Sequence, residues 1–316
     1  MRLHRVVVMM LLLVLAWSCK KDEENPIVEI PPRPLNEVSV ENEADIQAFL
    51  KTHFYNYEEF ANPPADFNFK IKIDTLAGEN ADKIPLSEQI QSEKIKISPS
   101  DLDLEDQAGT EQNLYYLVAR EGAGGSPTVG DSTYLKYEGS LLDGTLFDGN
   151  SSYTWQYLPF YLRGYAKGIS HFRTGDDILV NNDGTTSITN SGIGLIIMPS
   201  ALGYYDAGTG VIAPYSNLMF QIDAGLYVEN TDYDQDGIPS ILEDLNKDGI
   251  LSNDNTDAEA EAKVYPPTYV PNHLDRDDDG DGTLTRDEII INPDGTITFP
   301  DTNGNGIPDY LDKDTK

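Results

Sequence analysis

Residues 137–150 read YEGSLLDGTLFDGN, and this segment lies within a succession of short apolar stretches. Strands are expected on both sides of it, at residues 114–118, 133–137, 177–180, 194–198 and 217–226. Residues 157–172 have the apolar spacing of a helix. One helix among several antiparallel strands predicts an α+β fold.

Several motifs between residues 113 and 229 resemble, in order, the FKBP family of peptidyl-prolyl isomerases. YEGSLLDGTLFDGN matches the family's tyrosine, glycine, turn and Phe-Asp pattern. The segments that follow it are YTW (153–155), LRGYAKG (162–168), IMPSALGY (197–204), VIAP (211–214) and LMF (218–220). The resemblance implies an antiparallel sheet wrapped around one short helix.

The same resemblance implies a pocket for the proline of a polypeptide client. Its lining would be Tyr137, Phe147, Asp148, Trp155, Leu162, Tyr165, Tyr204, Ile212 and Phe220. An aromatic side chain from residues 155–165 would form the floor, the Leu162 backbone amide would meet the substrate carbonyl, and Asp148 would hold Tyr137. Rotation about Xaa-Pro has a barrier of about 20 kcal/mol because amide resonance is lost. No cofactor is expected for catalysis, since a dry aromatic pocket disfavours the charge-separated resonance form.

Three departures from the family pattern keep a second hypothesis open. Tyr205 stands where the family has glycine, Tyr161 replaces a small aliphatic residue, and residues 181–192 read as an inserted hairpin. The first hypothesis is an isomerase that assists protein folding. The alternative is an FKBP-like binding scaffold with little turnover, which presents a calcium-dependent module to a partner.

Residues 277–288, DDDGDGTLTRDE, carry every ligand position of an EF-hand calcium loop. Oxygen ligands are expected at loop positions 1, 3, 5, 7, 9 and 12, with glycine at position 6 for the sharp turn. In this loop they are Asp277, Asp279, Asp281, Thr283, Thr285 and Glu288.

Two further loops repeat the pattern. The first supplies Asp232, Asp234, Asp236, Ile238, Ser240 and Glu243, and the last supplies Asp301, Asn303, Asn305, Ile307, Asp309 and Asp312. A fourth begins at Asp244 but has Asn255 at position 12. This overlap and the repeated Gly-Ile-Pro resemble thrombospondin type 3 repeats. We expect structural calcium that orders residues 230–316; surface turns and, without calcium, disorder are the alternatives.

The N-terminus has the features of a lipoprotein signal peptide at residues 1–18, with two arginines before a short apolar core. Cys19, the single cysteine, follows a small residue as in a bacterial lipobox, so we expect lipid attachment there. Residues 20–24 (KKDEE) fit either a Bacteroidetes surface-export signal or a solvated tether. The expected location is the outer membrane, facing the periplasm or the cell surface.

Charge limits the partners. The chain has 54 acidic against 22 basic residues and a net charge of −32. Such a body is repelled by nucleic acid and by anionic lipid, which excludes both as expected partners.

The predicted organisation is a tether at 19–40, an N-terminal α+β extension at 41–112 with a helix at 43–57, the isomerase domain at 113–229 and the acidic repeats at 230–316.

Overall fold

A six-stranded antiparallel sheet organises the computed structural model, which describes residues 31–104, 108–182 and 186–315. In spatial order the strands are β3 (Gln91–Ile97), β4 (Thr110–Arg120), β9 (Gly192–Met198), β10 (Leu218–Val228), β5 (Ser132–Leu141) and β6 (Leu146–Tyr157). The α+β fold class is therefore confirmed. Since β3 pairs with β4, the sheet extends N-terminally of residue 113, the start predicted for the central domain.

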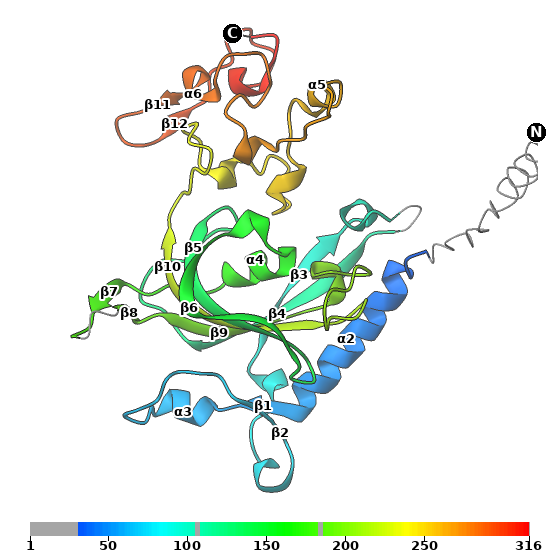
Figure 1. Cartoon of the computed structure of the whole chain (residues 1–316), viewed down its shortest axis with the longest axis vertical. Coiled ribbons are helices and arrows are strands. Elements are labelled where there is room, and N and C mark those ends of the chain that lie inside the picture. Colours follow the sequence, from blue (N-terminus) through cyan, green and yellow to red (C-terminus); the bar gives the residue numbers. More distant parts are fainter. Residues whose placement is uncertain (1–30, 105–107, 183–185, 316) are drawn as a thin grey trace, which may run out of the picture. The chain divides into compact units, whose positions relative to one another are not determined.

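Helix α4 (Arg163–Ile169) packs inside the curve of the sheet, as Figure 1 shows. A Cβ atom at Gly168 would lie 2.6 Å from Ile196 Cδ1 of β9, so glycine is required for this close approach. The helix is shorter than the predicted 157–172. Pro159 lies in a 3₁₀ turn, η4 (Leu158–Phe160), and Leu162 is extended, with ψ 138°, so helical geometry starts only at Arg163.

The other face of the sheet is covered by α2 (Leu35–Thr52), which begins earlier and ends earlier than the predicted 43–57. Its buried positions follow helical spacing, but one of them is Asn42. Asn42 Nδ2 donates to Tyr215 O at 2.9 Å, and Asn42 Oδ1 accepts from Ser200 N at 2.9 Å. This polar residue interrupts the apolar pattern, and the helix crosses the tether boundary predicted at residue 40.

Smaller elements complete the N-terminal and central parts. They are β1 (His53–Tyr55), which pairs with β2 (Ile73–Thr75), α3 (Tyr57–Ala61), η1 (Gly78–Asn80), η2 (Leu86–Glu88), η3 (Pro99–Leu102), η5 (Ser200–Leu202), and the hairpin of β7 (Asp177–Val180) and β8 (Thr186–Thr189). The strand predicted at 177–180 thus belongs to the inserted hairpin and is outside the main sheet.

Residues 230–315 form short elements joined by loops (Figure 1). They are η6 (Ser240–Glu243), η7 (Leu251–Asn253), α5 (Ala258–Glu261), η8 (Asn272–Leu274), α6 (Thr285–Glu288), β11 (Ile290–Ile291), β12 (Ile297–Thr298) and η9 (Asp309–Leu311). A small apolar cluster of Ile238, Ile289 and Tyr310 takes one residue from each predicted calcium-loop region.

The described residues from Pro34 onward belong to one compact unit. The predicted signal peptide and Cys19 lie outside the described residues. Within the described ranges, no helix has both the length and the hydrophobicity that a membrane span requires.

The packing of α2 generates a stability prediction. Ile46 is fully buried against the sheet, whereas Val40 of the same helix is 70% exposed. Ile46→Ala should lower the free energy of unfolding by about 2–5 kcal/mol, the usual cost of such a cavity. Val40→Ala should change it by less than about 0.5 kcal/mol. Urea unfolding of both variants measures this, and equal effects would mean that α2 is not part of the core.

Candidate active site and metal centre

Four aromatic side chains from four elements pack edge to face on the α4 side of the sheet. The Phe220 ring of β10 lies 4.9 Å from Tyr165 of α4 and 5.4 Å from Phe147 of β6, between ring centroids. Tyr137 of β5 lies 5.8 Å from Tyr165. Tyr165 and Phe220 are buried, while Tyr137 and Phe147 are half-buried. The cluster therefore has a buried aromatic floor and two partly exposed walls.

Asp148 is hydrogen-bonded at the edge of this floor. Tyr137 Oη donates to Asp148 Oδ2 at 2.7 Å. Burial, followed by this carboxylate, raises the pKa of Tyr137, so its hydroxyl stays protonated. Gly139 lies opposite Asp148 in the β5–β6 pair, and a Cβ atom there would lie 2.5 Å from Phe147 Cε2. Glycine at 139 thus leaves space for the Phe147 ring.

Leu162 lies at the N-terminal end of α4 with its backbone N–H available. Its carbonyl accepts from Ala166 N at 3.0 Å, but no hydrogen bond among the described residues uses the Leu162 N–H. Of the other predicted lining residues, Ile212 is buried and Tyr204 is 36% exposed.

Trp155 is not brought to this cluster. It is 54% exposed, and its ring stacks on Tyr134 at 5.0 Å. Tyr134 alternates along β5 with the inward-facing Leu135, which is fully buried. Trp155 therefore lies on the outer face of the sheet, and Tyr165 supplies the floor of the cluster.

The two tyrosines that depart from the family pattern occupy different environments. Tyr205 is 2% exposed, packs in the core at 5.2 Å from Tyr215, and has a φ of +48°. This left-handed backbone explains why glycine suits the position. Tyr161 is 41% exposed, with its ring 5.6 Å from Tyr165. Only Tyr161 stands beside the aromatic floor.

Gln156 is a further residue that positions the floor, and sequence reasoning did not identify it. Tyr165 Oη donates to Gln156 Oε1 at 2.8 Å, and both side chains are buried. A buried polar pair that satisfies itself fixes the orientation of a ring. No sequence motif marks this glutamine, because its partner lies on another element.

The acidic loops share one backbone geometry. Gly237, Gly282 and Gly306 at position 6 have φ values of +104°, +94° and +92°. Each of these glycines donates its N–H to the position-1 carboxylate, at 2.9–3.1 Å. The carboxylates of the first trio, Asp232, Asp234 and Asp236, converge within 4.8 Å, as do Asp277, Asp279 and Asp281 of the second. The loops are thus folded around positions 1, 3 and 5.

Buried oxygen atoms in the first two loops lack hydrogen-bond partners among the described residues. They include Asp234 Oδ2, Asp236 Oδ2, both carboxylate oxygens of Glu243, Asp277 Oδ1, both carboxylate oxygens of Asp278, Asp279 Oδ2 and Glu288 Oε1. Burial raises the pKa of Asp234 to about 8 and that of Glu288 to about 7, and the neighbouring carboxylates add to both shifts. Hard oxygen donors that lack protein partners fit a calcium ion.

The third loop is internally satisfied. Asn303 Nδ2 and Asn305 Nδ2 both donate to Asp312 Oδ2 at 2.7 Å. These amides and the neighbouring N–H groups lower the pKa of Asp312. The predicted position-12 ligand is therefore engaged by its own loop.

The position-9 residues hold the loops together from inside. Ser240 Oγ, Thr285 Oγ1 and Asp309 Oδ1 each accept from the backbone N–H at position 2, at 2.9–3.3 Å. Thr285 and Ser240 are fully buried. These three side chains were predicted as ligands. In each loop, the position-9 side chain instead forms a hydrogen bond with the loop's own backbone.

Another acidic group lies outside the three predicted loops, and the spacing of ligands in the sequence did not predict it. Asp257, Glu261 and Asp275 converge within 4.8 Å. The Glu261 carboxylate accepts from Asn255 Nδ2 at 2.7 Å and from Val270 N at 2.9 Å. Because these donors already satisfy Glu261, the group differs from the first two loops.

The first acidic loop packs directly on the sheet. Tyr233 stacks on Tyr157, at the end of β6, with 4.1 Å between centroids. The Tyr157 hydroxyl and His273 Nδ1 are hydrogen-bonded at 2.8 Å, and burial lowers the pKa of His273 to about 4, which keeps it neutral. The contact joins the loop to the segment that leads into Tyr161.

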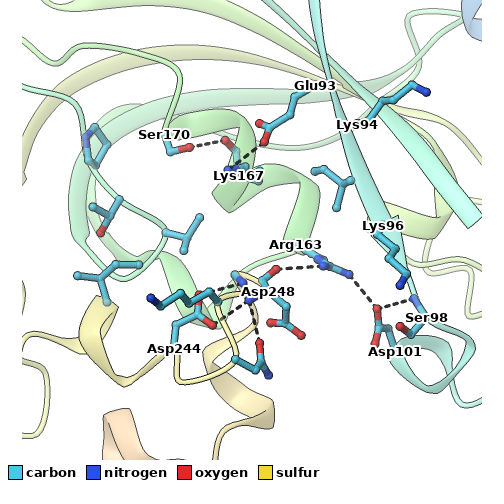
Figure 2. A pocket seen from close by; sticks show the side chains of 18 residues that line it. Glu93, Lys94, Lys96, Ser98, Asp101, Arg163, Lys167, Ser170, Asp244 and Asp248 are labelled. Carbon is cyan, nitrogen blue, oxygen red and sulfur yellow. Dashed lines mark hydrogen bonds and ion pairs between the residues drawn. The ribbon is translucent and has the colours of Figure 1, made fainter. Parts of the chain in front are cut away.

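A cleft of about 830 Å³ lies between β3, α4 and residues 244–249 (Figure 2). Arg163 reaches across it, donating to Asp101 Oδ2 at 2.9 Å and to Asp248 O at 3.0 Å. Lys167 pairs with Glu93 at 3.2 Å. These bonds tie the start of α4 to both flanking segments.

Part of the chain is similar in sequence to known prolyl isomerases. No family model matches it. It is 34% identical over 112 residues to the peptidyl-prolyl cis-trans isomerase Mip of Coxiella burnetii, covering 35% of this chain and 43% of that protein. It is 31% identical over 110 residues to the FKBP-type isomerase FkpA of Escherichia coli K12, covering 35% of this chain and 36% of that one. The chain thus spans less than half the length of these relatives.

Solved structures of the same kind are also similar. The crystal structure of FkpA from Escherichia coli covers 61% of this chain and 62% of its own, at 19% identity and a TM-score of 0.33. Over about a third of its length, the chain is similar in sequence to FKBP-type peptidyl-prolyl cis-trans isomerases.

Proposed function

We propose that the chain is a peptidyl-prolyl cis-trans isomerase whose site is the cluster of Tyr137, Phe147, Asp148, Tyr165 and Phe220. The observation that carries this proposal is the Tyr137–Asp148 hydrogen bond beside a buried aromatic floor. The arrangement combines an apolar surface for a proline ring with a polar edge that orients a peptide. Sequence similarity to named isomerases supports the same function.

The reaction needs no nucleophile, because only rotation about the Xaa-Pro amide is required. The proline ring would lie on Tyr165 and Phe220, where the excluded water favours the less charged, twisted amide. The free Leu162 N–H would donate to a substrate carbonyl and hold one side of the peptide. Asp148 keeps Tyr137 in place and leaves the edge of the site polar.

Phe147→Ala tests the pocket. Removing this ring should lower kcat/KM for a proline peptide by about tenfold to a hundredfold, since covering the half-buried Phe147 ring with a proline would contribute roughly 1.5–3 kcal/mol. Leu146→Ala is the matched control, because Leu146 is the neighbouring residue and is 60% exposed. A protease-coupled peptide assay gives both values.

The wild-type result of that assay decides between the two hypotheses. Acceleration that Phe147→Ala weakens and Leu146→Ala preserves supports the isomerase. A folded wild-type chain with no acceleration over the uncatalysed rate contradicts it and supports the binding scaffold, for which Tyr161 beside the floor is the structural reason.

We further propose that residues 230–316 form a calcium-stabilised module. The partnerless buried oxygens of the first two loops support it, since burying such carboxylates without a cation is costly. The small core of Ile238, Ile289 and Tyr310 offers little apolar area to offset that cost. Calcium, when bound, would neutralise the carboxylates.

Removing calcium should therefore loosen this module. With chelator, residues 230–316 should become protease-sensitive, while the six-stranded sheet stays resistant. Restored protection should require roughly 10⁻⁴–10⁻³ M calcium, the range of extracellular modules. Limited proteolysis followed by mass spectrometry of the fragments measures this, and identical digestion with and without chelator would contradict the proposal.

We also propose lipid attachment at Cys19 and an outer-membrane location, on the signal-like sequence before it. Cys19→Ser in the full chain should shift the protein from the detergent phase to the aqueous phase in a phase-partition assay. Lys20→Ser is the control, because it changes the adjacent residue and keeps the thiol. Equal partitioning of all three proteins would refute the anchor.

A further inference from the structure

Asp278 is a buried acid that the loop pattern does not assign to any role. It lies at position 2 of the second loop, between the expected ligands Asp277 and Asp279. Its side chain is 1% exposed, and both carboxylate oxygens lack a hydrogen-bond partner among the described residues. A carboxylate so far from water and from donors requires another partner.

The neighbours of Asp278 belong to the first loop. Oxygens of Asp278, Asp236 and Glu243 all lie within 4.8 Å of one another, although Asp278 is 35 or more positions away in the sequence. Asp236 is 1% exposed and Glu243 is fully buried. Asp236 Oδ2 and both Glu243 oxygens are also without hydrogen-bond partners among residues 31–315 that are described.

Among the described residues, no basic side chain forms an ion pair with this group, and the charge of Arg286 only partly offsets the burial that raises the pKa of Asp236. The nearby Arg276 directs its Nε to the Asp234 carbonyl. Three buried carboxylates at this separation repel one another strongly in a medium of low dielectric constant.

We propose that Asp236, Glu243 and Asp278 bind one divalent cation that bridges the first two acidic loops. The inference rests on the proposed calcium module and extends it, because the loop pattern alone gives each loop a separate ion. Asp236 also belongs to the trio with Asp232 and Asp234, so the bridging site is continuous with the first loop. All-oxygen ligands favour calcium over a softer metal.

The bridge would make the two loops fold as one unit. Asp278 N donates to Thr285 Oγ1 at 3.1 Å, which fixes the backbone of the second loop beside Asp278. Arg276 joins the same backbone to the first loop at Asp234. An ion bound by the three carboxylates would therefore link the first and second loops, which are distant in the sequence. Loss of the ion would destabilise both loops together.

Asp278→Asn in the full chain tests the proposal by calcium titration in a calorimeter. One site should weaken by about tenfold or more, because a charged ligand is lost. Asp236→Asn should weaken the same site, and the double variant should be less impaired than independent effects predict. Asp287→Asn is the matched control, since Asp287 is exposed in the same loop and loses the same charge.

Thermal unfolding with and without calcium separates a ligand from a merely structural acid. Asp278→Asn should raise the stability of the module in chelator, because it removes repulsion, and lower it in calcium. A decrease in both conditions, or calcium binding equal to that of Asp287→Asn, would overturn the bridging site while leaving the calcium module intact. A wild-type chain that binds no calcium would overturn both.

Discussion

The close packing of α4 against β9 is the constraint on which the candidate active site depends. The helix has seven residues, too few to be stable alone, so its contacts with the sheet hold it. Gly168 permits the approach to Ile196, and the buried Tyr165 follows from it. Because Leu162 immediately precedes the helix and Tyr165 lies within it, this one packing arrangement positions both the free N–H and the aromatic floor.

Two parts of the described chain differ in how many ionisable groups they bury. In the aromatic cluster, burial keeps Tyr137 protonated and leaves Asp148 as the only acid of the site, at an exposed edge. In the acidic loops, several carboxylates are buried together with few protein donors. An apolar site of the first kind suits a reaction without charged intermediates, and a group of the second kind suits a cation.

The segments outside the resemblance also support the site. Tyr157 ends β6, contacts Tyr233 and His273, and lies four residues before Tyr161. Arg163 starts α4 and bonds to Asp101 on one side and to Asp248 on the other. The entrance to α4 is therefore held by the N-terminal and acidic regions, which gives both a physical connection to the aromatic cluster.

The sequence by itself determined the features that depend on local spacing. The positive-φ glycines and the converging carboxylates of the loops follow from a twelve-residue pattern, because their ligands are close along the chain. The α+β class followed from strand and helix periodicity. Tyr137, Phe147, Tyr165 and Phe220 were identified together through the resemblance, since motif order carries information about contacts that periodicity lacks.

Only the tertiary structure decided which face or neighbour each side chain has. Trp155 and Tyr165 are both aromatic, but strand alternation places Trp155 outside and helix packing places Tyr165 inside. The polar Asn42 interrupts the apolar pattern, so the start of α2 at Leu35 could not be predicted from the sequence. Its hydrogen-bond partners are more than 150 residues away. The loop pattern gives Asp278 no role, and only the packing of the first loop shows that its carboxylate is buried beside Asp236 and Glu243. In each case, contacts between segments that are distant in the sequence stabilise the observed position of the side chain. A local sequence pattern does not encode such contacts.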